Sequence, residues 1–447
     1  MSDPNHPQRP TTGDDWPAPN LPRGRTFPAQ LLLAAELLER ITDQGLPADR
    51  SLQRELAARR KMGRRDRERV RELTLFVLRQ RGVLDWLLDD GTPSMAARVA
   101  AALSLADALD PVLADVAGLT PQAVTSLTRR RAERFISLPW TARFNLAPAA
   151  AKQWQAWQPD APETLTRALD ARATVDLHAN PRHGDRDALI DELTGAEIEA
   201  RAITELPLGL RLERPARLTR LPAFEAGGFE VQDAGSQWVV RTLQAQPGER
   251  VLDLCAGAGG KSLGLLDEAR GQLHLTACDL HPERLDRLRT RARRHGDTDL
   301  ELRALDATQS LPTDLIDFDR VLIDAPCSGS GTWRRHPELR WADIDWDGLA
   351  ETQSQLLERG SQATRPGGRL LYATCSLWPA ENEAVVEAFL SRHPGWRVIR
   401  PSLDGLPEDA FTADGWIRLR PDRHECDGFF IACLQAPTHP STNQPTA

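Results

Sequence analysis

Residues 367–383 read Gly-Gly-Arg-Leu-Leu-Tyr-Ala-Thr-Cys-Ser-Leu-Trp-Pro-Ala-Glu-Asn-Glu, and this stretch decides the fold. The apolar run 370–373 has the length and composition of a buried strand, and Pro366-Gly367-Gly368 predicts a turn leading into it. Cys375 stands where a parallel strand would end, and Pro379 predicts the start of a helix. Because open α/β sheets bind ligands at the carboxyl ends of their strands, Cys375 is a candidate nucleophile. From position alone, a small apolar plug is an equally good interpretation.

A second cysteine follows a similar strand. Residues 318–329 read Phe-Asp-Arg-Val-Leu-Ile-Asp-Ala-Pro-Cys-Ser-Gly, so that Asp324 and Cys327 come after an apolar run. If the two strands are neighbours in one parallel sheet, they lie about 5 Å apart. Asp324, Cys327 and Cys375 would then converge at one edge. Two thiols and a carboxylate at one sheet edge are hard to explain as packing, and they predict a catalytic site.

Length and composition indicate a multidomain protein. At 447 residues the chain is long enough for two or three domains, and its 27% charged and 40% hydrophobic residues are ordinary for a soluble protein. No apolar run reaches the roughly 18 residues of a membrane span. Residues 1–20 are rich in Pro and Asp without an apolar core, so they do not read as a signal peptide. The six cysteines are scattered without zinc-ligand spacing, which predicts free thiols in a reducing cytoplasm and no metal site.

The charge is uneven along the chain. The formal net charge is −8, which argues against a protein that is basic over its whole surface. One short stretch nevertheless gathers many basic residues, namely Arg59, Arg60, Lys61, Arg64, Arg65, Arg67, Arg69 and Arg71. A local basic patch on an acidic protein can hold a phosphate backbone. A solvated helix face is an equally good interpretation of the charge alone.

The chain reads as three folded parts between two tails. Residues 27–136 repeat apolar positions at helical spacing and predict an all-helical domain. Residues 137–229 mix helical and strand-like pieces and predict a small α/β linker domain. From 230 to 435 strands and helices alternate, as in a doubly wound sheet. The tails, residues 1–26 and 436–447, are rich in Pro and are expected to be disordered.

The third part contains the loop Cys255-Ala256-Gly257-Ala258-Gly259-Gly260-Lys261-Ser262, which has three interpretations. A phosphate-binding P-loop would need glycine at position 255, and a dinucleotide fingerprint would need it at position 262. The third interpretation is a nucleoside cofactor, because glycines let a backbone approach a ligand closely. Asp279 ends the next predicted strand, 273–278, and its carboxylate can accept hydrogen bonds from both hydroxyls of a ribose. It could equally cap a helix. Asp306 ends the strand after that, 300–305, and can meet an adenine edge.

These residues match a known family. The chain resembles the Sun/Nop/RsmB-type RNA cytosine-5 methyltransferases, and its helical part resembles the NusB-type RNA-binding domain of the bacterial ribosomal RNA members, with residues 66–88 as the matching piece. In family order, the matching pieces of the third part are Gln232-Asp233 with Ser236-Gln237, Asp253-Leu254-Cys255 with Gly259-Gly260-Lys261, Asp324-Ala325-Pro326-Cys327-Ser328-Gly329, Arg335-His336-Pro337 with Trp341, Tyr372-Ala373-Thr374-Cys375-Ser376 with Glu381-Asn382-Glu383, and Asp427-Gly428-Phe429-Phe430. The chain departs from the family at Gly257-Ala258, where Ala-Pro is usual, and at residues 177–180, where arginine before Val-Asn is usual.

The resemblance implies a Rossmann-like class I methyltransferase domain preceded by a NusB-like helical domain and the α/β linker. It implies that S-adenosylmethionine is bound by residues 255–261 with Asp279, Asp306 and Asp324. It implies that Cys375 is the nucleophile and that Cys327 assists release. Asp324, between cofactor and base, and Lys261 complete the implied catalytic set.

The function expected from the resemblance is methylation of cytosine C5 in RNA, with ribosomal RNA as the substrate. The other expectations are a monomeric, cytoplasmic enzyme that contacts no membrane. Three alternatives stay open from the residues: a transfer RNA cytosine methyltransferase, a non-catalytic RNA-binding assembly factor that has kept the fold, and a phosphate-binding NTPase suggested by Gly260-Lys261-Ser262.

Overall fold

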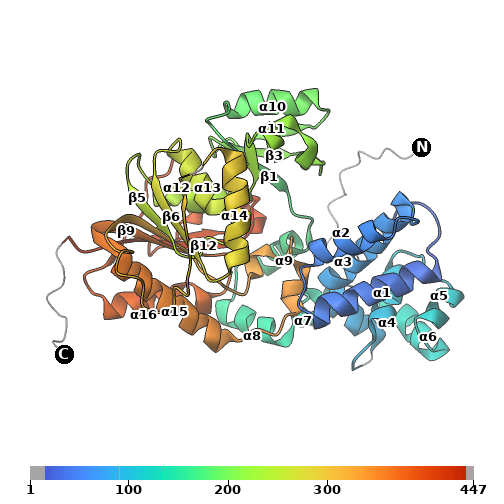
Figure 1. Cartoon of the computed structure of the whole chain (residues 1–447). Coiled ribbons are helices and arrows are strands. Elements are labelled where there is room, and N and C mark those ends of the chain that lie inside the picture. The colour runs from blue at the N-terminus through green and yellow to red at the C-terminus, as the bar shows by residue number, and fades with distance from the viewer. Residues whose placement is uncertain (1–15, 90, 134, 298, 439–447) are drawn as a thin grey trace. The chain divides into compact units, whose positions relative to one another are not determined.

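The computed structural model describes residues 16–89, 91–133, 135–297 and 299–438 (Figure 1). They form two compact units. The first unit comprises the described residues up to Asp170 together with Trp333–Ile344, and the second comprises Ala171–Thr332 with the described residues from Asp345 onward. This division differs from the predicted boundaries after residues 136 and 229. The predicted disordered tails, 1–26 and 436–447, fall largely outside the described residues.

The first unit is helical, as the apolar spacing predicts. Side chains with no exposure fill its core, such as Leu38, Leu73 and Val99. Thr120 caps α6, since its hydroxyl accepts a hydrogen bond from the Ala123 amide at 3.2 Å. The elements are α1 (Pro28–Asp43), α2 (Ala48–Ala58), α3 (Arg64–Leu88), α4 (Met95–Leu105), α5 (Pro111–Val116), α6 (Pro121–Arg131), η1 (Phe135–Ser137), α7 (Trp140–Arg143), α8 (Pro148–Trp157), α9 (Pro162–Asp170) and η4 (Pro337–Trp341).

The segment Trp333–Ile344 follows closely after Cys327 in sequence but packs within the first unit. Arg340 is almost fully buried there, and its guanidinium donates to the Asp170 carboxylate at 2.6 Å. The Trp341 indole N–H donates to the Leu78 carbonyl, also at 2.6 Å. Because an Arg in an apolar core needs a partner, these bonds fix where the segment lies.

The second unit contains a small antiparallel sheet with strand order β2-β3-β1-β4. Asp185 caps α10, because its carboxylate accepts a hydrogen bond from the Ala188 amide at 2.7 Å. Strand β1 was not predicted, although its residues were noted for departing from the family pattern. The elements are β1 (Val175–Ala179), α10 (Arg186–Gly195), β2 (Ala200–Ala202), β3 (Gly209–Leu212), η2 (Leu218–Arg220), α11 (Pro222–Glu225) and β4 (Phe229–Val231).

The second unit also contains an eight-stranded sheet with the order β10-β12-β9-β8-β5-β6-β7, and β11 pairs with β12. Strands β5 to β9 run parallel, which confirms the predicted doubly wound sheet. Strands β10, β11 and β12 are paired antiparallel. The strands are β5 (Arg250–Asp253), β6 (His274–Asp279), β7 (Glu301–Ala304), β8 (Phe318–Asp324), β9 (Thr364–Thr374), β10 (Arg397–Val398), β11 (Ile417–Leu419) and β12 (Phe429–Gln435).

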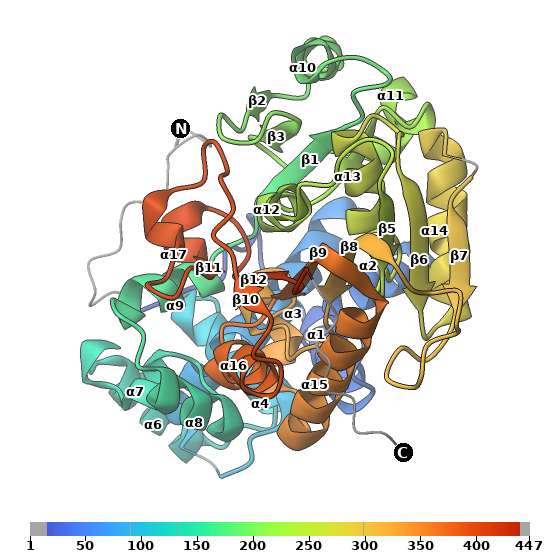
Figure 2. The same ribbon diagram turned by 90° about the vertical axis from the view of Figure 1, so that its left-hand side faces the viewer.

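Helices cover both faces of this sheet. Alternate strand residues enter two cores: Leu322 packs with α12, α13 and α14, whereas Ile323 packs with α15 and α16. Figures 1 and 2 show these two helix layers on opposite sides of the strands. The helices are α12 (Ala234–Leu243), α13 (Gly260–Glu268), α14 (Pro282–His295), α15 (Trp346–Ala363), α16 (Glu383–Arg392) and α17 (Pro421–His424), with the short turns η3 (Ser330–Thr332), η5 (Pro379–Glu381) and η6 (Glu408–Ala410).

One local prediction was wrong, and another was confirmed only in part. The predicted turn at Pro366-Gly367-Gly368 lies inside β9, where it forms a bulge because four residues between Thr364 and Arg369 face the single residue between Phe318 and Arg320. Gly367 supplies the positive φ of +71° that this bulge needs. The helix predicted from Pro379 is interrupted: η5 ends at Glu381 and α16 begins at Glu383. Asn382 breaks it, because its side-chain amide donates to the Ser376 carbonyl at 3.0 Å.

No helix within the described ranges combines the length and the apolar character that a membrane span requires. The described side chains of His, Cys, Asp and Glu form no group of three or more placed to hold a metal ion.

Candidate active site

Strands β8 and β9 bring the two predicted cysteines together. The strands are parallel neighbours, and Asp324 at the end of β8 pairs with Ala373, two residues before Cys375. The Sγ atoms of Cys327 and Cys375 are 3.5 Å apart, so the predicted convergence of the thiols is confirmed. Both cysteines are half-buried. They can therefore reach a ligand at the carboxyl edge of the sheet.

The surroundings of Cys327 shift the pKa of its thiol. The contact with Cys375 and burial together raise the pKa of Cys327 well above that of a free thiol, and the Glu381 carboxylate adds to this shift. Cys327 is therefore a protonated thiol at neutral pH. It can donate a hydrogen bond to the sulfur of Cys375.

A lysine–carboxylate pair lies beside the cysteines. Lys261, in the first turn of α13, places its Nζ 2.6 Å from Oδ2 of Asp324. Burial alone would lower the pKa of Lys261, but Asp324 outweighs it, so the pKa lies above its usual value. A negative charge on Cys375 raises this pKa further, which places the ammonium within electrostatic reach of that sulfur. The ammonium is thus engaged by protein carboxylate, which does not favour the phosphate-binding alternative.

The glycine-rich loop joins β5 to α13 and adopts a backbone conformation that lets other groups approach it closely. Gly257 and Gly259 have φ values of +57° and +83°, which side-chain-bearing residues rarely adopt. A Cβ on Gly259 would lie 2.0 Å from Cδ1 of Leu288, so the backbone there packs directly on α14. At Gly257 no described heavy atom lies within 4 Å of the same position. The loop is therefore packed against α14 at Gly259 and leaves open space beside Gly257.

The two strand-end aspartates are placed differently. Asp279 is almost fully buried, and its carboxylate accepts hydrogen bonds from the Gly257 and His281 amides, both at 2.8 Å. It therefore holds the glycine loop, while each oxygen keeps a lone pair for a ligand. Asp306 is exposed, and its Oδ1 accepts from the Thr308 hydroxyl at 2.6 Å.

A third aspartate, Asp253, ends β5 with no exposure to solvent. Burial raises its pKa to about 7, partly offset by the Ser262 hydroxyl, which donates to Oδ2 at 2.7 Å. Among the described residues its Oδ1 has no hydrogen-bond partner. A buried carboxylate oxygen without a partner is costly, so this atom fits a site completed by a ligand's donor group.

The sequence did not predict which side chains hold the two cysteine loops. Glu381 was named within a family-matching piece but was given no role, yet its carboxylate accepts from the hydroxyls of Ser328 and Ser376. These serines directly follow the two cysteines, and that repeated Cys-Ser pair is the signal that could have identified them. Gln353 of α15 also bonds to Glu381, and nothing in its local sequence indicates this.

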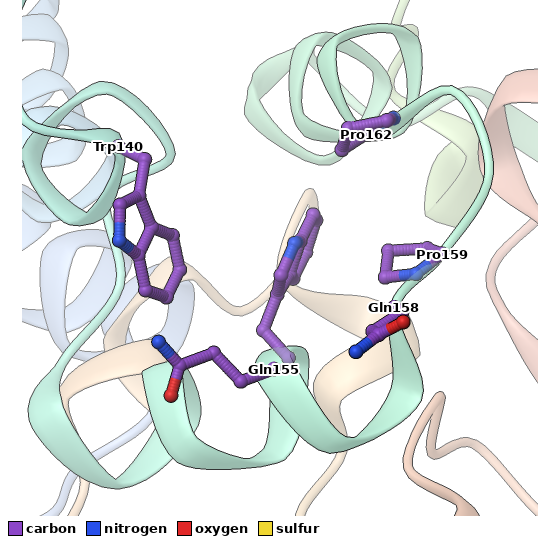
Figure 3. A pocket seen from close by; sticks show the side chains of 6 residues that line it. Trp140, Gln155, Gln158, Pro159 and Pro162 are labelled. Atoms are coloured by element: carbon purple, nitrogen blue, oxygen red, sulfur yellow. The ribbon is translucent and has the colours of Figure 1, made fainter.

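A pocket of about 490 Å³ lies in the first unit (Figure 3). It is lined by the residues Trp140, Trp154, Gln155, Gln158, Pro159 and Pro162. None of these side chains is a nucleophile or titrates near neutral pH. The pocket therefore does not supply the groups of the cysteine site.

Two protein-family models match this chain. A family model described as "16S rRNA methyltransferase RsmB/F" matches residues 240–435. A second model, described as "Methyltr_RsmF/B-like, ferredoxin-like domain", matches residues 150–219, a range that spans parts of both structural units.

Two curated relatives and one solved structure are similar over long stretches. The ribosomal RNA small subunit methyltransferase B of Shigella flexneri is 30% identical over 441 residues, covering 90% of this chain and 97% of that protein. A probable ribosomal RNA small subunit methyltransferase B of Synechocystis sp. is 36% identical over 289 residues, which are 63% of this chain and 64% of that protein. The crystal structure of PH0851 covers 92% of this chain and 100% of its own, with a TM-score of 0.77 and 23% identity, a likeness of fold.

Proposed function

Because this chain belongs to the 16S rRNA methyltransferase RsmB/F family, we propose that it methylates C5 of a cytosine in ribosomal RNA. The chain is an S-adenosylmethionine-dependent RNA methyltransferase, and the Rossmann-like fold expected from the resemblance is confirmed. We propose in addition which base is methylated, which of its atoms receives the methyl group and which residues catalyse the transfer. The observation that carries it is the pair of half-buried thiols 3.5 Å apart at the edge where ligands of such sheets bind.

Cytosine C5 is too weak a nucleophile to be methylated directly. Addition of the Cys375 thiolate to C6 forms an Sγ–C6 bond and turns the ring into an enamine, whose C5 is nucleophilic. A thiolate suits this step because sulfur combines strong nucleophilicity with a modest pKa. Asp324 lies at the adjoining strand end and can stabilise charge that develops at the ring nitrogen N3. An unpaired or flipped-out base is needed for this contact.

Release needs a base to remove the C5 proton, so that the C5–C6 double bond reforms and the Sγ–C6 bond breaks. We propose Cys327 for this step, because its Sγ lies 3.5 Å from that of Cys375. Before attack, its contact with Cys375 is the largest cause of its raised pKa. To act as the base, the Cys327 thiol first gives up its own proton to water. The thiolate then takes the proton from C5 and becomes a thiol again.

The residues of the cofactor loop fit S-adenosylmethionine, which supplies the methyl group when bound. Gly257 leaves room for a ligand against the backbone, and Asp253 offers a buried carboxylate oxygen without a protein partner. Asp279 holds the loop and keeps acceptor capacity for ribose hydroxyls. Lys261 joins this loop to Asp324 and so fixes the acid relative to the cofactor site. Asp306 is proposed at the adenine end.

Replacing Asp279 by alanine is expected to weaken S-adenosylmethionine binding. Loss of charge-assisted hydrogen bonds costs roughly 1.5–3 kcal/mol, which corresponds to about a 10- to 150-fold rise in Kd. Isothermal titration calorimetry measures this directly, and Asp286→Ala on the exposed part of α14 is the matched control. An unchanged affinity in a folded Asp279→Ala protein would remove this residue from the cofactor site.

Nucleoside mass spectrometry tests the proposed reaction itself. Purified protein, S-adenosylmethionine and unmodified small-subunit ribosomal RNA should yield 5-methylcytidine after digestion. Transfer RNA in a parallel reaction distinguishes the alternative substrate. If both RNAs bind but neither gains 5-methylcytidine, the result would favour the alternative of a non-catalytic RNA-binding assembly factor.

We propose a specific surface for RNA binding by the helical residues 27–136. Of the eight basic residues between 59 and 71, four are used internally: Arg59 pairs with Glu55 at 3.2 Å, Arg71 pairs with Asp49 at 2.7 Å, Arg67 donates to the Arg59 carbonyl at 3.0 Å, and Arg69 is buried against the Pro22 carbonyl. The other four are exposed around the turn between α2 and α3, and in the described chain none forms an ion pair; they are Arg60, Lys61, Arg64 and Arg65. Free cations grouped at one turn fit phosphate contacts.

Changing these four residues to glutamine is expected to weaken ribosomal RNA binding and its salt dependence, because each lost phosphate contact lowers the slope of log K against log salt by about 0.7–0.9. Filter binding across a salt series gives both quantities. The matched control removes the same charge from four scattered exposed residues of the same unit: Arg23, Arg50, Arg129 and Lys152. Equal losses in the two quadruple variants would show a general charge effect and refute the assignment.

A further inference from the structure

The two cysteine loops share one buried carboxylate, that of Glu381. It is 1% exposed. Oε1 accepts from the Ser328 amide at 2.7 Å, and Oε2 accepts from the hydroxyls of Ser328 and Ser376, both at 2.5 Å. Ser328 follows Cys327 and Ser376 follows Cys375. One side chain thus bonds to the residue next to each thiol.

Helix α15 completes this arrangement. Gln353, which has no exposure, donates its Nε2 hydrogens to Oε1 of Glu381 at 3.2 Å and to the Pro326 carbonyl at 2.9 Å. The Tyr372 hydroxyl donates to the Glu381 backbone carbonyl at 2.7 Å. Within the described chain Glu381 makes no ion pair with a cation, so neutral donors alone satisfy its charge. Burying a carboxylate in this way is costly. Such a fully satisfied polar group specifies one local geometry.

Other bonds connect the same loops but do not replace this carboxylate. The Gly331 amide donates to the Cys375 carbonyl at 2.9 Å, and the Leu377 amide donates to the Ser330 hydroxyl at 2.8 Å. The Ser376 hydroxyl also lies 3.3 Å from that of Ser328 and 3.2 Å from that of Ser330. Glu381 differs from these pairwise contacts, because one carboxylate accepts from the residues that follow both cysteines and from Gln353 of α15.

We propose that Glu381 is a positioning residue that fixes the separation of the Cys327 and Cys375 thiols, so that both can act on one cytosine. The consequence for catalysis rests on the proposed function, whereas the geometric role does not. No hydrogen bond joins Glu381 to either sulfur in the described structure. Glu381 acts through Ser328 and Ser376.

Two substitutions separate the geometry from the charge. In Glu381→Gln, the amide oxygen can accept from the Ser328 amide and Gln353, while the amide NH₂ donates to the two hydroxyls, which accept as readily as they donate. This variant keeps the loops joined and removes the negative charge. Glu381→Ala leaves these donors without their shared acceptor and removes the carboxylate that links the two loops.

The test measures thiol separation without RNA. Full-length protein is treated with the diazene oxidant diamide, which takes two electrons and two protons from Cys327 and Cys375 and becomes the hydrazine as the disulfide forms. Peptide mass mapping follows the rate of this one disulfide. Because disulfide geometry is restrictive, we expect the rate to fall about tenfold or more in Glu381→Ala and to stay near wild type in Glu381→Gln. Glu383→Gln, two residues away and paired with Arg418, is the matched control and should also stay near wild type.

Methyl transfer by the same variants provides the second readout. A displacement of about 1 Å can lower a catalytic rate about 100-fold, so kcat should fall by that order in Glu381→Ala, with rescue in Glu381→Gln and no change in S-adenosylmethionine affinity.

If Glu381→Ala does not fold, Ser376→Ala replaces it, because it removes the bond on the Cys375 side alone. A folded Glu381→Ala or Ser376→Ala that forms the disulfide at the wild-type rate overturns the inference. If the disulfide slows but wild-type protein makes no 5-methylcytidine, the positioning role stands and the proposed function fails.

Discussion

Replacing Cys375 by serine is expected to abolish methyl transfer to ribosomal RNA and to leave no covalent RNA–protein species. The reaction requires addition to C6, and a serine hydroxyl is a weak nucleophile without a dedicated base. Loss of a nucleophile in an enzyme that depends on it costs about 10³-fold or more in rate. Initial rates of labelled methyl transfer from S-adenosylmethionine measure the effect.

Cys433→Ser is the matched control for this substitution. Cys433 lies in β12 at 2% exposure and packs in the core on one face of the same sheet. Its serine variant should melt at a lower temperature, because it buries a hydroxyl in an apolar core, yet retain its catalytic rate. Similar losses of rate in the Cys375 and Cys433 variants would mean that Cys375 has a structural role.

Replacing Cys327 by serine is expected to have the opposite effect on the covalent species. Attack and methylation remain possible because Cys375 is intact, but the C5 proton is removed slowly, so that the adduct accumulates. A denaturing gel should show a band that contains both protein and RNA. In the variant lacking both thiols the band should be absent, because release matters only after attack.

The assignment of the two thiols reverses if the band appears with Cys375→Ser and is missing with Cys327→Ser. A structural cysteine at either position would give no band and only lower stability. The gel therefore separates nucleophile, release residue and packing residue in one comparison.

Strands such as β6 and β8 could be predicted because each is a short apolar run that ends at a polar residue, Asp279 or Asp324, whereas the short strands β10 and β11 were not predicted. The same pattern placed both cysteines at one edge, since parallel neighbours align their carboxyl ends. Turn chemistry was less reliable. Pro366-Gly367-Gly368 has the composition of a turn, but a bulge in β9 has the same need for a positive φ.

Contacts between residues far apart in the sequence could not be predicted from the residues around them. Glu381 reads like any acidic residue near a helix start, and its role appears only when the loops after β8 and β9 are side by side. The segment Trp333–Ile344 likewise gave no sign that it packs with helices far earlier in the chain, because the partners of Arg340 and Trp341 are backbone and acidic groups common everywhere. Burial of these bonds is what makes them specific, and burial is a property of the folded chain.

The most direct test of the account is to identify the bonded residue in the covalent species. Cys327→Ser protein is incubated with small-subunit ribosomal RNA and S-adenosylmethionine, digested with protease and nuclease, and the cross-linked peptide is sequenced by mass spectrometry. The expected product is a cytidine that carries one added methyl group and is attached to Cys375. A cross-link at another residue, or a base other than cytosine in the adduct, would contradict it.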